Sequence, residues 1–212
     1  PSGPVETYPR VKNGQVESVS FQGLPSFVFK DNVDVEIEDL GPISGSIGFG
    51  GNWYYYVNAD ELGIELNTEN INLLLEQGNR IKAALGNKLN LIHPTNDFID
   101  KNLTGVAFYR ETNEGKVDQV NVIVESNSFY DRSPCGTGTC GRMAMLNAEG
   151  RLPEGANFVN KSITGSVFQG EVLEETKVGD KPAIIPKITG SAHITGFNQL
   201  LIDPDDPLKN GF

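Results

Sequence analysis

Residues 131–150 read DRSPCGTGTCGRMAMLNAEG, and this stretch sets the interpretation of the whole chain. A glycine-rich turn leads here straight into a helix-forming segment, Met143 to Glu149. The start of a helix carries partial positive charge and N–H groups without intrahelical partners, which favour a thiolate and hold small carboxylates. Cys135 lies at this start, so the sequence predicts a base and an anion-binding turn in one place. This combination suits chemistry on the carbon next to a carboxylate.

The bulk composition is that of a soluble globular protein. The 212 residues suffice for one large domain or two small ones, and the 38% hydrophobic and 21% charged content is ordinary. A net charge of −11 without a basic cluster speaks against nucleic-acid binding. No apolar run approaches the roughly 18 residues of a membrane span. Two cysteines make no disulfide framework and no signal peptide opens the chain, so we expect a cytoplasmic protein with free thiols.

Hydrophobic periodicity predicts many strands and two long helices. One helix should follow Thr68, which we take as its N-cap, and end at Gly86, and the second should cover residues 136–149. The Asn13-Gly14 pair marks a hairpin turn. Strands are expected at 5–8, 16–21, 33–38, 53–57, 105–110, 117–124 and 158–202, the last with breaks at 178–181 and 190. The lack of regular strand–helix alternation indicates the α+β class.

The glycines of the turn also spell Gly136-x-Gly138-x-x-Gly141, the pattern of a dinucleotide-binding loop. That interpretation requires a strand that runs directly into the glycines, within a parallel sheet. Residues 131–134 intervene after the expected strand. We therefore interpret the glycines as a tight anion-binding turn.

Each candidate residue also has a structural interpretation. Cys135 could be a buried core cysteine, but its place after proline and before a glycine-rich helix start favours a reactive thiol. Asp131 either accepts a hydrogen bond from a substrate ammonium or caps the turn, and the spacing leaves both open. Cys140 is expected to pack inward. Neither His93 nor His193 stands at metal-ligand spacing from cysteines or carboxylates, so no metal site is predicted.

The string DRSPCGTGTC, residues 131–140, resembles the second-cysteine motif of the proline racemase and hydroxyproline 2-epimerase family. The similarity extends over nearly the whole chain, through residues 1–6, 25–27, 50–53, 162–168 and 203–207. The resemblance implies the fold of diaminopimelate epimerase, with two pseudo-symmetric α+β domains and the substrate in the cleft between them. On this basis residues 29–196 form one complete domain that carries the motif. Residues 1–28 and 197–212 are then the edge of the other domain.

The resemblance further implies an isomerase without a cofactor, which inverts Cα of proline or 4-hydroxyproline with two thiols. One cysteine removes the α-proton as a thiolate, and a second on the opposite face returns a proton as a thiol. Matched position by position, Cys135 is the second thiol, and Gly136 and Thr137 are the groups that bind the carboxylate. Asp131 matches the residue that faces the substrate amine. The chemistry is consistent, because a developing enediolate needs preorganised N–H dipoles and each thiol needs a pKa near neutrality.

The chain departs from the family pattern in one respect. The family's first-cysteine motif, a Cys-Gly-His run, does not occur, because neither Cys135 nor Cys140 is followed by histidine. We therefore expect the other thiol to come from an N-terminal portion that precedes Pro1, and this chain to hold one half of the site. The opening without methionine agrees with a fragment or a processed chain. The sequence leaves open whether the protein forms a homodimer.

Within the family, a cysteine at position 135 favours racemisation or epimerisation, because relatives that dehydrate trans-3-hydroxyproline commonly carry threonine there. Trp53 after Gly-Gly-Asn favours hydroxyproline as the substrate. The absence of histidine around Val106 argues the other way. The alternative enzyme is a trans-3-hydroxyproline dehydratase or epimerase. The alternative of another class is a non-catalytic module that holds a small carboxylate at the helix start.

Overall fold

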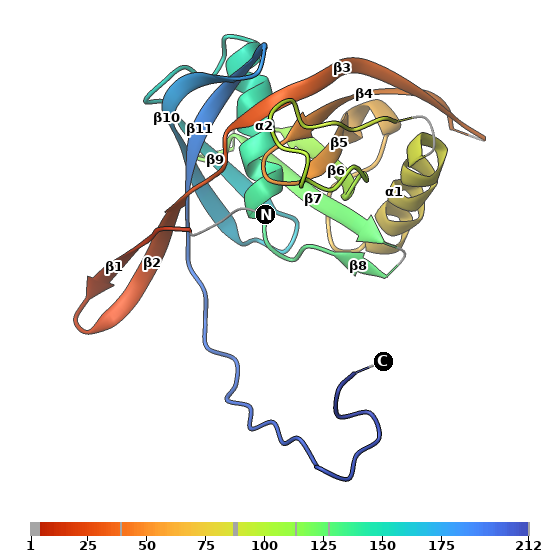
Figure 1. Cartoon of the computed structure of the whole chain (residues 1–212). Coiled ribbons are helices and arrows are strands. Elements are labelled where there is room, and N and C mark those ends of the chain that lie inside the picture. Colours follow the sequence, from red (N-terminus) through yellow and green to blue (C-terminus); the bar gives the residue numbers. More distant parts are fainter. Residues whose placement is uncertain (1–4, 39, 87–88, 113, 127, 212) are drawn as a thin grey trace.

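The strands of the protein form one continuous mixed sheet (Figure 1). The computed structural model describes residues 5–38, 40–86, 89–112, 114–126 and 128–211. Its strands are β1 (Thr7–Lys12), β2 (Gln15–Gln22), β3 (Ser26–Ile37), β4 (Gly41–Phe49), β5 (Trp53–Asn58), β6 (Gly105–Glu111), β7 (Gln119–Ser126), β8 (Phe129–Tyr130), β9 (Asn157–Ser162), β10 (Val167–Val178) and β11 (Lys181–Gly190). The helices are the 3-10 turn η1 (Ala59–Leu62), α1 (Ile71–Gly86) and α2 (Gly136–Ala148). Within these ranges, neither α1 nor α2 has the length and apolar character needed to cross a membrane.

The sheet closes on itself into a barrel. Its strands follow the order β11-β10-β9-β7-β6-β5-β4-β3, and β3 pairs back onto β11 where Phe27 faces Ala183. The pairs β5–β6 and β7–β9 are parallel, whereas the other neighbours around the barrel are antiparallel. The hairpin β1–β2 is attached to β11 through β2 and projects away from the barrel (Figure 1).

Helix α2 runs through the middle of the barrel (Figure 1). It packs against β10 and β11 on one side and against β3, β4 and β5 on the other. Every residue from Gly138 to Leu146 is buried. A helix surrounded by strands has no solvent face, so its sequence is small or apolar nearly all round. Functional groups on α2 can therefore reach solvent or a ligand only at the two ends of the barrel, and all others lie in its interior.

Strands β5, β6 and β7 separate two apolar cores. On β5, Trp53 and Tyr55 face the core that α1 covers, whereas Tyr54 and Tyr56 face α2. Strands β6 and β7 alternate in the same way, so both faces of this part of the sheet are buried. A strand buried on both faces reads as a continuous apolar run, which explains the aromatic stretch of β5.

The structure confirms the expected α+β class and the expected hairpin. Asn13 and Gly14 have φ values of 51° and 76°, as the tight turn between β1 and β2 requires. Helix α1 starts at Ile71, later than expected, and Thr68 is not its N-cap. The cause is local, because the Asn67 side chain accepts the N–H of Asn70 and holds a turn before the helix.

The expected strand beyond Gly190 is wrong. Residues 191–202 form neither helix nor strand and leave the barrel as an extended tail (Figure 1). The side chains of Ile194, Phe197 and Leu200 are 83, 95 and 90% exposed. The apolar pattern that predicted a strand is present, but within the described part of the chain no strand lies beside it to complete a ladder of hydrogen bonds.

Gly78 marks a close approach between α1 and β7. A Cβ at this position would lie 2.8 Å from Cβ of Val124 and 3.2 Å from the ring of Phe108. We expect Gly78→Ala to lower the free energy of unfolding by about 1–3 kcal/mol, because overpacking outweighs the better helix propensity of alanine. Urea unfolding followed by circular dichroism measures this change.

Gly86→Ala, at the end of the same helix, is the matched control. No described atom lies within 4 Å of a Cβ built at Gly86, so this variant should be at least as stable as the parent. Equal stability of the two variants would contradict the tight packing of α1 on β7.

Candidate active site

Cys135 is the N-cap residue of α2, so the expected helix start beside this thiol is confirmed. Its Sγ accepts the N–H of Gly138 at 3.4 Å, in the place where a serine or aspartate oxygen usually caps a helix. Gly136 and Thr137 are the first two residues of the helix, and their N–H groups have no acceptor within it. The structure thus brings the predicted thiol and the predicted anion-binding turn together.

The backbone of Cys135 is strained. Its φ of 63° and ψ of 120° lie in a region that residues with a Cβ rarely adopt, which costs on the order of 1–3 kcal/mol. The peptide bond before it is held on both sides. The carbonyl of Pro134 accepts Nδ2 of Asn121 at 2.8 Å and Oγ1 of Thr139 at 3.2 Å, and the N–H of Cys135 donates to Oγ of Ser133 at 3.0 Å. These bonds hold the thiol in a conformation that it would otherwise leave.

Cys135 belongs to a buried apolar cluster that has a polar side at the sulfur. The cluster also contains Tyr56, Ala107, Ile123 and Met145, and Cys135 is only 5% exposed. The Tyr54 hydroxyl approaches Sγ to 3.5 Å and the Thr137 hydroxyl approaches it to 3.6 Å. These two hydroxyls are 2.9 Å apart and share a hydrogen bond. The polar side therefore offers a short hydrogen-bonded chain from the sulfur through Tyr54 to Thr137.

Burial raises the pKa of Cys135 above the ordinary value of a cysteine. Hydrogen bonds from Tyr54, Thr137 and the Gly138 N–H oppose this shift without cancelling it. The helix start favours the thiolate, as expected, but desolvation of the charged form has a larger effect on the pKa of Cys135 than these hydrogen bonds. Burial also raises the pKa of Tyr54, so this phenol keeps its proton and is available as a donor to sulfur.

Asp131 has the structural role that the sequence left open. Its Oδ1 accepts both the N–H of Ser133 at 2.9 Å and the hydroxyl of Ser133 at 2.8 Å. Ser133 in turn accepts the N–H of Cys135, so Asp131 orders the turn that carries the thiol. Its charge also acts to raise the pKa of Cys135, which places the carboxylate within electrostatic range of the sulfur. A contact with a substrate amine remains a prediction.

A cavity of about 660 Å³ opens beside the start of α2. Thr137 lines it together with residues 21–25 and the turn Gly50-Gly51-Asn52. This turn lies directly on the helix, since a Cβ on Gly50 would be 2.1 Å from the Thr137 carbonyl oxygen. Neither Cys135 nor Tyr54 lines the cavity, whereas Thr137 does, and its hydroxyl is 3.6 Å from Sγ of Cys135. The helix start thus borders the cavity, and Thr137 connects the cavity with the thiol.

Sequence reasoning missed four residues of this site, namely Tyr54, Asn121, Ser133 and Thr139. Tyr54 and Asn121 are far from Cys135 in the sequence and reach it only because β5 and β7 pass beside α2. Cys140 packs inward as expected and is 1% exposed. Among the described residues there is no group of three histidine, cysteine or acidic side chains that could hold a metal ion.

Comparison with known proteins gives a consistent result. The family model described as proline racemase matches residues 1–212. The chain is 40% identical to the proline racemase of Clostridioides difficile and 39% identical to the trans-3-hydroxy-L-proline dehydratase of Bacillus thuringiensis subsp. konkukian. Both alignments cover 100% of this chain and 63% of the relative. The chain thus spans about two thirds, or slightly less, of the length of these proteins.

Two solved structures are similar over 98% of this chain, each with a TM-score of 0.89. One is a probable proline racemase from Agrobacterium radiobacter K84 with bound carbonate, at 32% identity and 60% coverage of that chain. The other is a hydroxyproline epimerase from Agrobacterium vitis with bound trans-4-hydroxy-L-proline, at 31% identity and 59% coverage. These similarities confirm the expected diaminopimelate-epimerase-like fold.

The contact between Tyr54 and Cys135 predicts a shift in thiol reactivity. Tyr54→Phe removes a donor that stabilises the thiolate, so the pKa of Cys135 should rise and alkylation by iodoacetamide should move to higher pH, by about one pH unit. The pH dependence of the alkylation rate measures this shift. A Cys140→Ala background ensures that only one thiol reacts.

Tyr55→Phe is the matched control, because the Tyr55 hydroxyl donates to Val33 and Ile43 carbonyls on the opposite face of β5. This variant should keep the parental pH dependence. An unchanged profile for Tyr54→Phe would show that Tyr54 does not donate to the thiolate.

Proposed function

The chain belongs to the proline racemase family, and on this premise we propose that it forms one half of an active site that inverts Cα of proline or 4-hydroxyproline. Cys135 supplies one of two acid/base thiols, and the reaction needs no cofactor. The observation that carries the proposal is the place of Cys135 at the N-cap of α2, in contact with the Tyr54 hydroxyl and the Gly138 N–H. The names of similar proteins, a proline racemase and a hydroxyproline epimerase, support the substrate class.

In the proposed reaction, a thiolate from outside this chain takes the α-proton while the Cys135 thiol gives its proton to the opposite face of the same carbon. One S–H bond forms and one breaks, so the two cysteines exchange protonation states and the carbon is inverted. Burial favours the protonated form of Cys135, which is the form that gives a proton. The reverse direction begins from the thiolate, for which Tyr54, Thr137 and Gly138 offer hydrogen bonds.

We propose that the N–H groups of Gly136 and Thr137 bind the substrate carboxylate at the border of the cavity. Removal of the α-proton moves negative charge onto that carboxylate as an enediolate, and N–H dipoles fixed in advance stabilise it most effectively. Asp131 is the proposed partner of the substrate amine. Its Oδ1 is occupied by Ser133, so Oδ2 is the oxygen assigned to this contact.

We propose that residues 1–28 and 197–212 belong to a second unit, which carries the other thiol, and that residues 29–196 form the unit around α2. We move the first boundary to Ser26, where β3 begins, because Phe27 pairs with Ala183 in the barrel. The projecting hairpin and the exposed apolar side chains of the tail support this division, since such side chains usually cover another surface. The 63% coverage of the curated relatives supports it as well. We place the protein in the cytoplasm, because both cysteines are free thiols.

A second candidate function is the dehydration of trans-3-hydroxyproline. The 39% identity to a trans-3-hydroxy-L-proline dehydratase favours it. The thiol at position 135 favours inversion instead, because elimination requires no proton donor on the second face. The two candidates therefore differ in whether Cys135 is required for the chemical step.

The test is exchange of the substrate Cα–H in deuterated water, followed by NMR in the full-length protein that contains this chain. With L-proline or trans-4-hydroxy-L-proline, Cys135→Ser should slow exchange by about 100-fold or more, since a serine hydroxyl is a poor acid/base group at neutral pH. Cys140→Ser is the matched control and should retain exchange, because the Cys140 side chain on α2 is buried in a different apolar cluster from that of Cys135. Exchange that continues unchanged in Cys135→Ser would overturn the proposed role.

Two further measurements separate the alternatives. Formation of a Δ1-pyrroline product from trans-3-hydroxy-L-proline would identify the dehydratase. Pyrrole-2-carboxylate, a planar mimic of the deprotonated intermediate, would bind both to an enzyme and to a non-catalytic carboxylate-binding module. Only the enzyme should combine this binding with Cα–H exchange that the ligand inhibits.

A further inference from the structure

A row of buried polar side chains lies between the parallel strands β7 and β9 and the helix α2. The strand register places Gln119 opposite Asn160 and Asn121 opposite Ser162. All four side chains belong to residues that are at most 3% exposed. Buried polar groups are costly unless they are fully hydrogen-bonded. The presence of four buried polar side chains in the interior of a barrel therefore requires an explanation.

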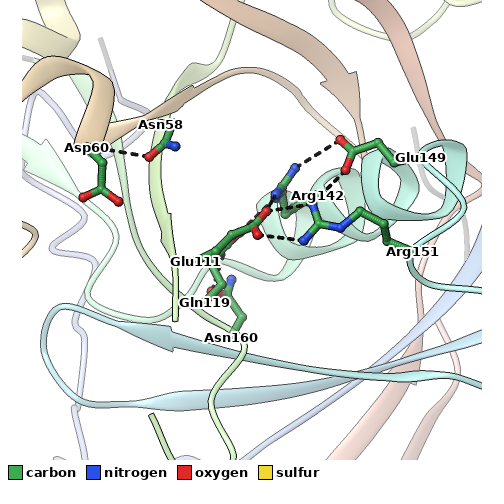
Figure 2. Close-up of polar contacts among 8 residues, drawn as sticks. All are labelled: Asn58, Asp60, Glu111, Gln119, Arg142, Glu149, Arg151 and Asn160. Carbon is green, nitrogen blue, oxygen red and sulfur yellow. Dashed lines mark hydrogen bonds and ion pairs between the residues drawn. The ribbon is translucent and has the colours of Figure 1, made fainter. Parts of the chain in front are cut away.

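Two of these side chains, those of Gln119 and Asn160, belong to a hydrogen-bonded chain that begins at Arg142 on α2. Nε of Arg142 donates to Oε1 of Gln119 at 2.8 Å, and Nε2 of Gln119 donates to Oδ1 of Asn160 at 3.3 Å. Nδ2 of Asn160 then donates to Oγ1 of Thr139 at 2.9 Å, and this hydroxyl donates to the carbonyl of Pro134 at 3.2 Å. The chain thus ends on the peptide bond that precedes Cys135. Figure 2 shows its first members, Arg142, Gln119 and Asn160.

The direction of this chain is fixed at its origin. A guanidinium has donors and no acceptor, so it turns Oε1 of Gln119 toward itself and Nε2 toward Asn160. The amide of Asn160 is oriented in the same way, with its NH₂ group toward Thr139. The hydroxyl of Thr139 therefore receives a hydrogen bond and has its own proton left for Pro134. Each link leaves only one arrangement for the next.

Arg142 itself is firmly anchored. The residue is 3% exposed, its guanidinium carbon lies 4.1 Å from the centre of the Tyr109 ring, and its NH2 pairs with Glu111 at 2.6 Å. Glu111 also pairs with Arg151 at 2.7 Å, as Figure 2 shows. The hydrogen bond from Arg151 and the charge of Arg142 hold the pKa of Glu111 below its usual range, so this carboxylate stays ionised.

From this arrangement we infer that Thr139 is a positioning residue for Cys135, oriented from Arg142 through Gln119 and Asn160. The inference rests on the proposed function of Cys135 as an acid/base thiol. Its physical content is that Thr139 holds the Pro134 carbonyl, and so keeps Cys135 in its strained conformation with Sγ beside Tyr54 and the Gly138 N–H.

The other residues with positive φ support the need for such a device. Apart from glycines, the described residues with positive φ are Asn13, Asn32 and Cys135. Asparagine tolerates this region and both asparagines are exposed, whereas cysteine has no such tolerance. Asn121 also donates to the Pro134 carbonyl, although its own Oδ1 finds no partner among the described residues. Two buried side chains, those of Asn121 and Thr139, therefore donate to the same carbonyl.

The first test removes the last link. Thr139→Val keeps the shape of the side chain but has no proton to donate to Pro134. The peptide bond should relax, and the sulfur should lose the contacts that stabilise its thiolate. We expect the pH dependence of Cys135 alkylation, in the Cys140→Ala background, to move to higher pH. In the full-length protein we expect kcat for Cα–H exchange to fall about tenfold with little change in KM. Thr139→Ser, which restores the hydroxyl, should recover both.

The second test reverses the direction of the hydrogen bonds from Gln119 to Thr139 and leaves no cavity at the substituted residue. Gln119→Glu presents only acceptors, so it can still pair with Arg142, but Asn160 must then turn its NH₂ group toward the new carboxylate. Oδ1 of Asn160 would face Thr139, whose proton would go to Asn160 instead of Pro134. This variant should reproduce the effects of Thr139→Val, although its change is remote from Cys135. It also keeps the inference testable if Thr139→Val does not fold.

Tyr55→Phe is the control for the loss of a buried hydroxyl on the other side of β5 and should change neither readout. Parental pH dependence and kcat in folded Thr139→Val and Gln119→Glu would overturn the inference. Losses that follow the unfolding free energy alone, without recovery in Thr139→Ser, would overturn it as well. Failure of the proposed function gives a different result, namely no exchange in the parent protein, while the alkylation profiles still test whether Thr139 positions the thiol.

Discussion

The peptide bond between Pro134 and Cys135 is the constraint on which the rest of the site depends. Its carbonyl is held by Asn121 and Thr139, and its N–H is held by Ser133. With this bond fixed, Cys135 has a positive φ and α2 begins at the next residue. One group of hydrogen bonds therefore fixes where α2 begins and where the sulfur lies. The backbone strain of about 1–3 kcal/mol is comparable to the net contribution of the three hydrogen bonds that hold it, about 0.5–1.5 kcal/mol each, so the loss of one bond matters.

The thiol illustrates how burial and polarity compete. The start of a helix and two hydroxyl groups favour a thiolate, but a pocket formed with Ile123 and Met145 excludes the water that would solvate it. Desolvation is the larger effect, so the pKa of Cys135 lies above the ordinary value. The proposed role of Cys135, which is to give and to receive a proton, would use both sides of this balance. The neutral form of the thiol is stable in the closed barrel, and its charged form has donors ready.

The position of α2 inside the barrel also explains why so many close contacts involve glycine. A Cβ on Gly50 would overlap the Thr137 carbonyl oxygen, and a Cβ on Gly141 would lie 2.2 Å from the Tyr56 hydroxyl. The strands can therefore approach the helix backbone closely enough to place Tyr54 and the turn of residues 50–52 beside the helix start. The pattern Gly136-x-Gly138-x-x-Gly141 thus has a packing role that has nothing to do with dinucleotides.

The sequence by itself determined the chemical character of the site. The order Pro134, Cys135, Gly136 before a helix-forming segment was sufficient to predict a thiol at a helix N-terminus, and the periodicity of the chain was sufficient for the α+β class. These features are local, since they depend on turn geometry and on residues a few positions apart. The sequence did not reveal β4, because Gly45 and its serine neighbours become a strand only when the ring of Tyr55 covers them. Nor did it show that residues 191–202 have no strand partner in the part of the chain that the structure describes, because this depends on which segments lie beside them.

Only the tertiary structure decided how the thiol is held and how strongly it is acidic. Tyr54, Asn121 and Asn160 come from separate strands, and their distance from Cys135 depends on barrel closure and on the register of β7 with β9. Desolvation likewise depends on every element that surrounds the sulfur, so no local pattern reports it. Helix starts and turns depend on neighbouring residues, whereas burial and long-range hydrogen bonds arise only when distant segments pack together.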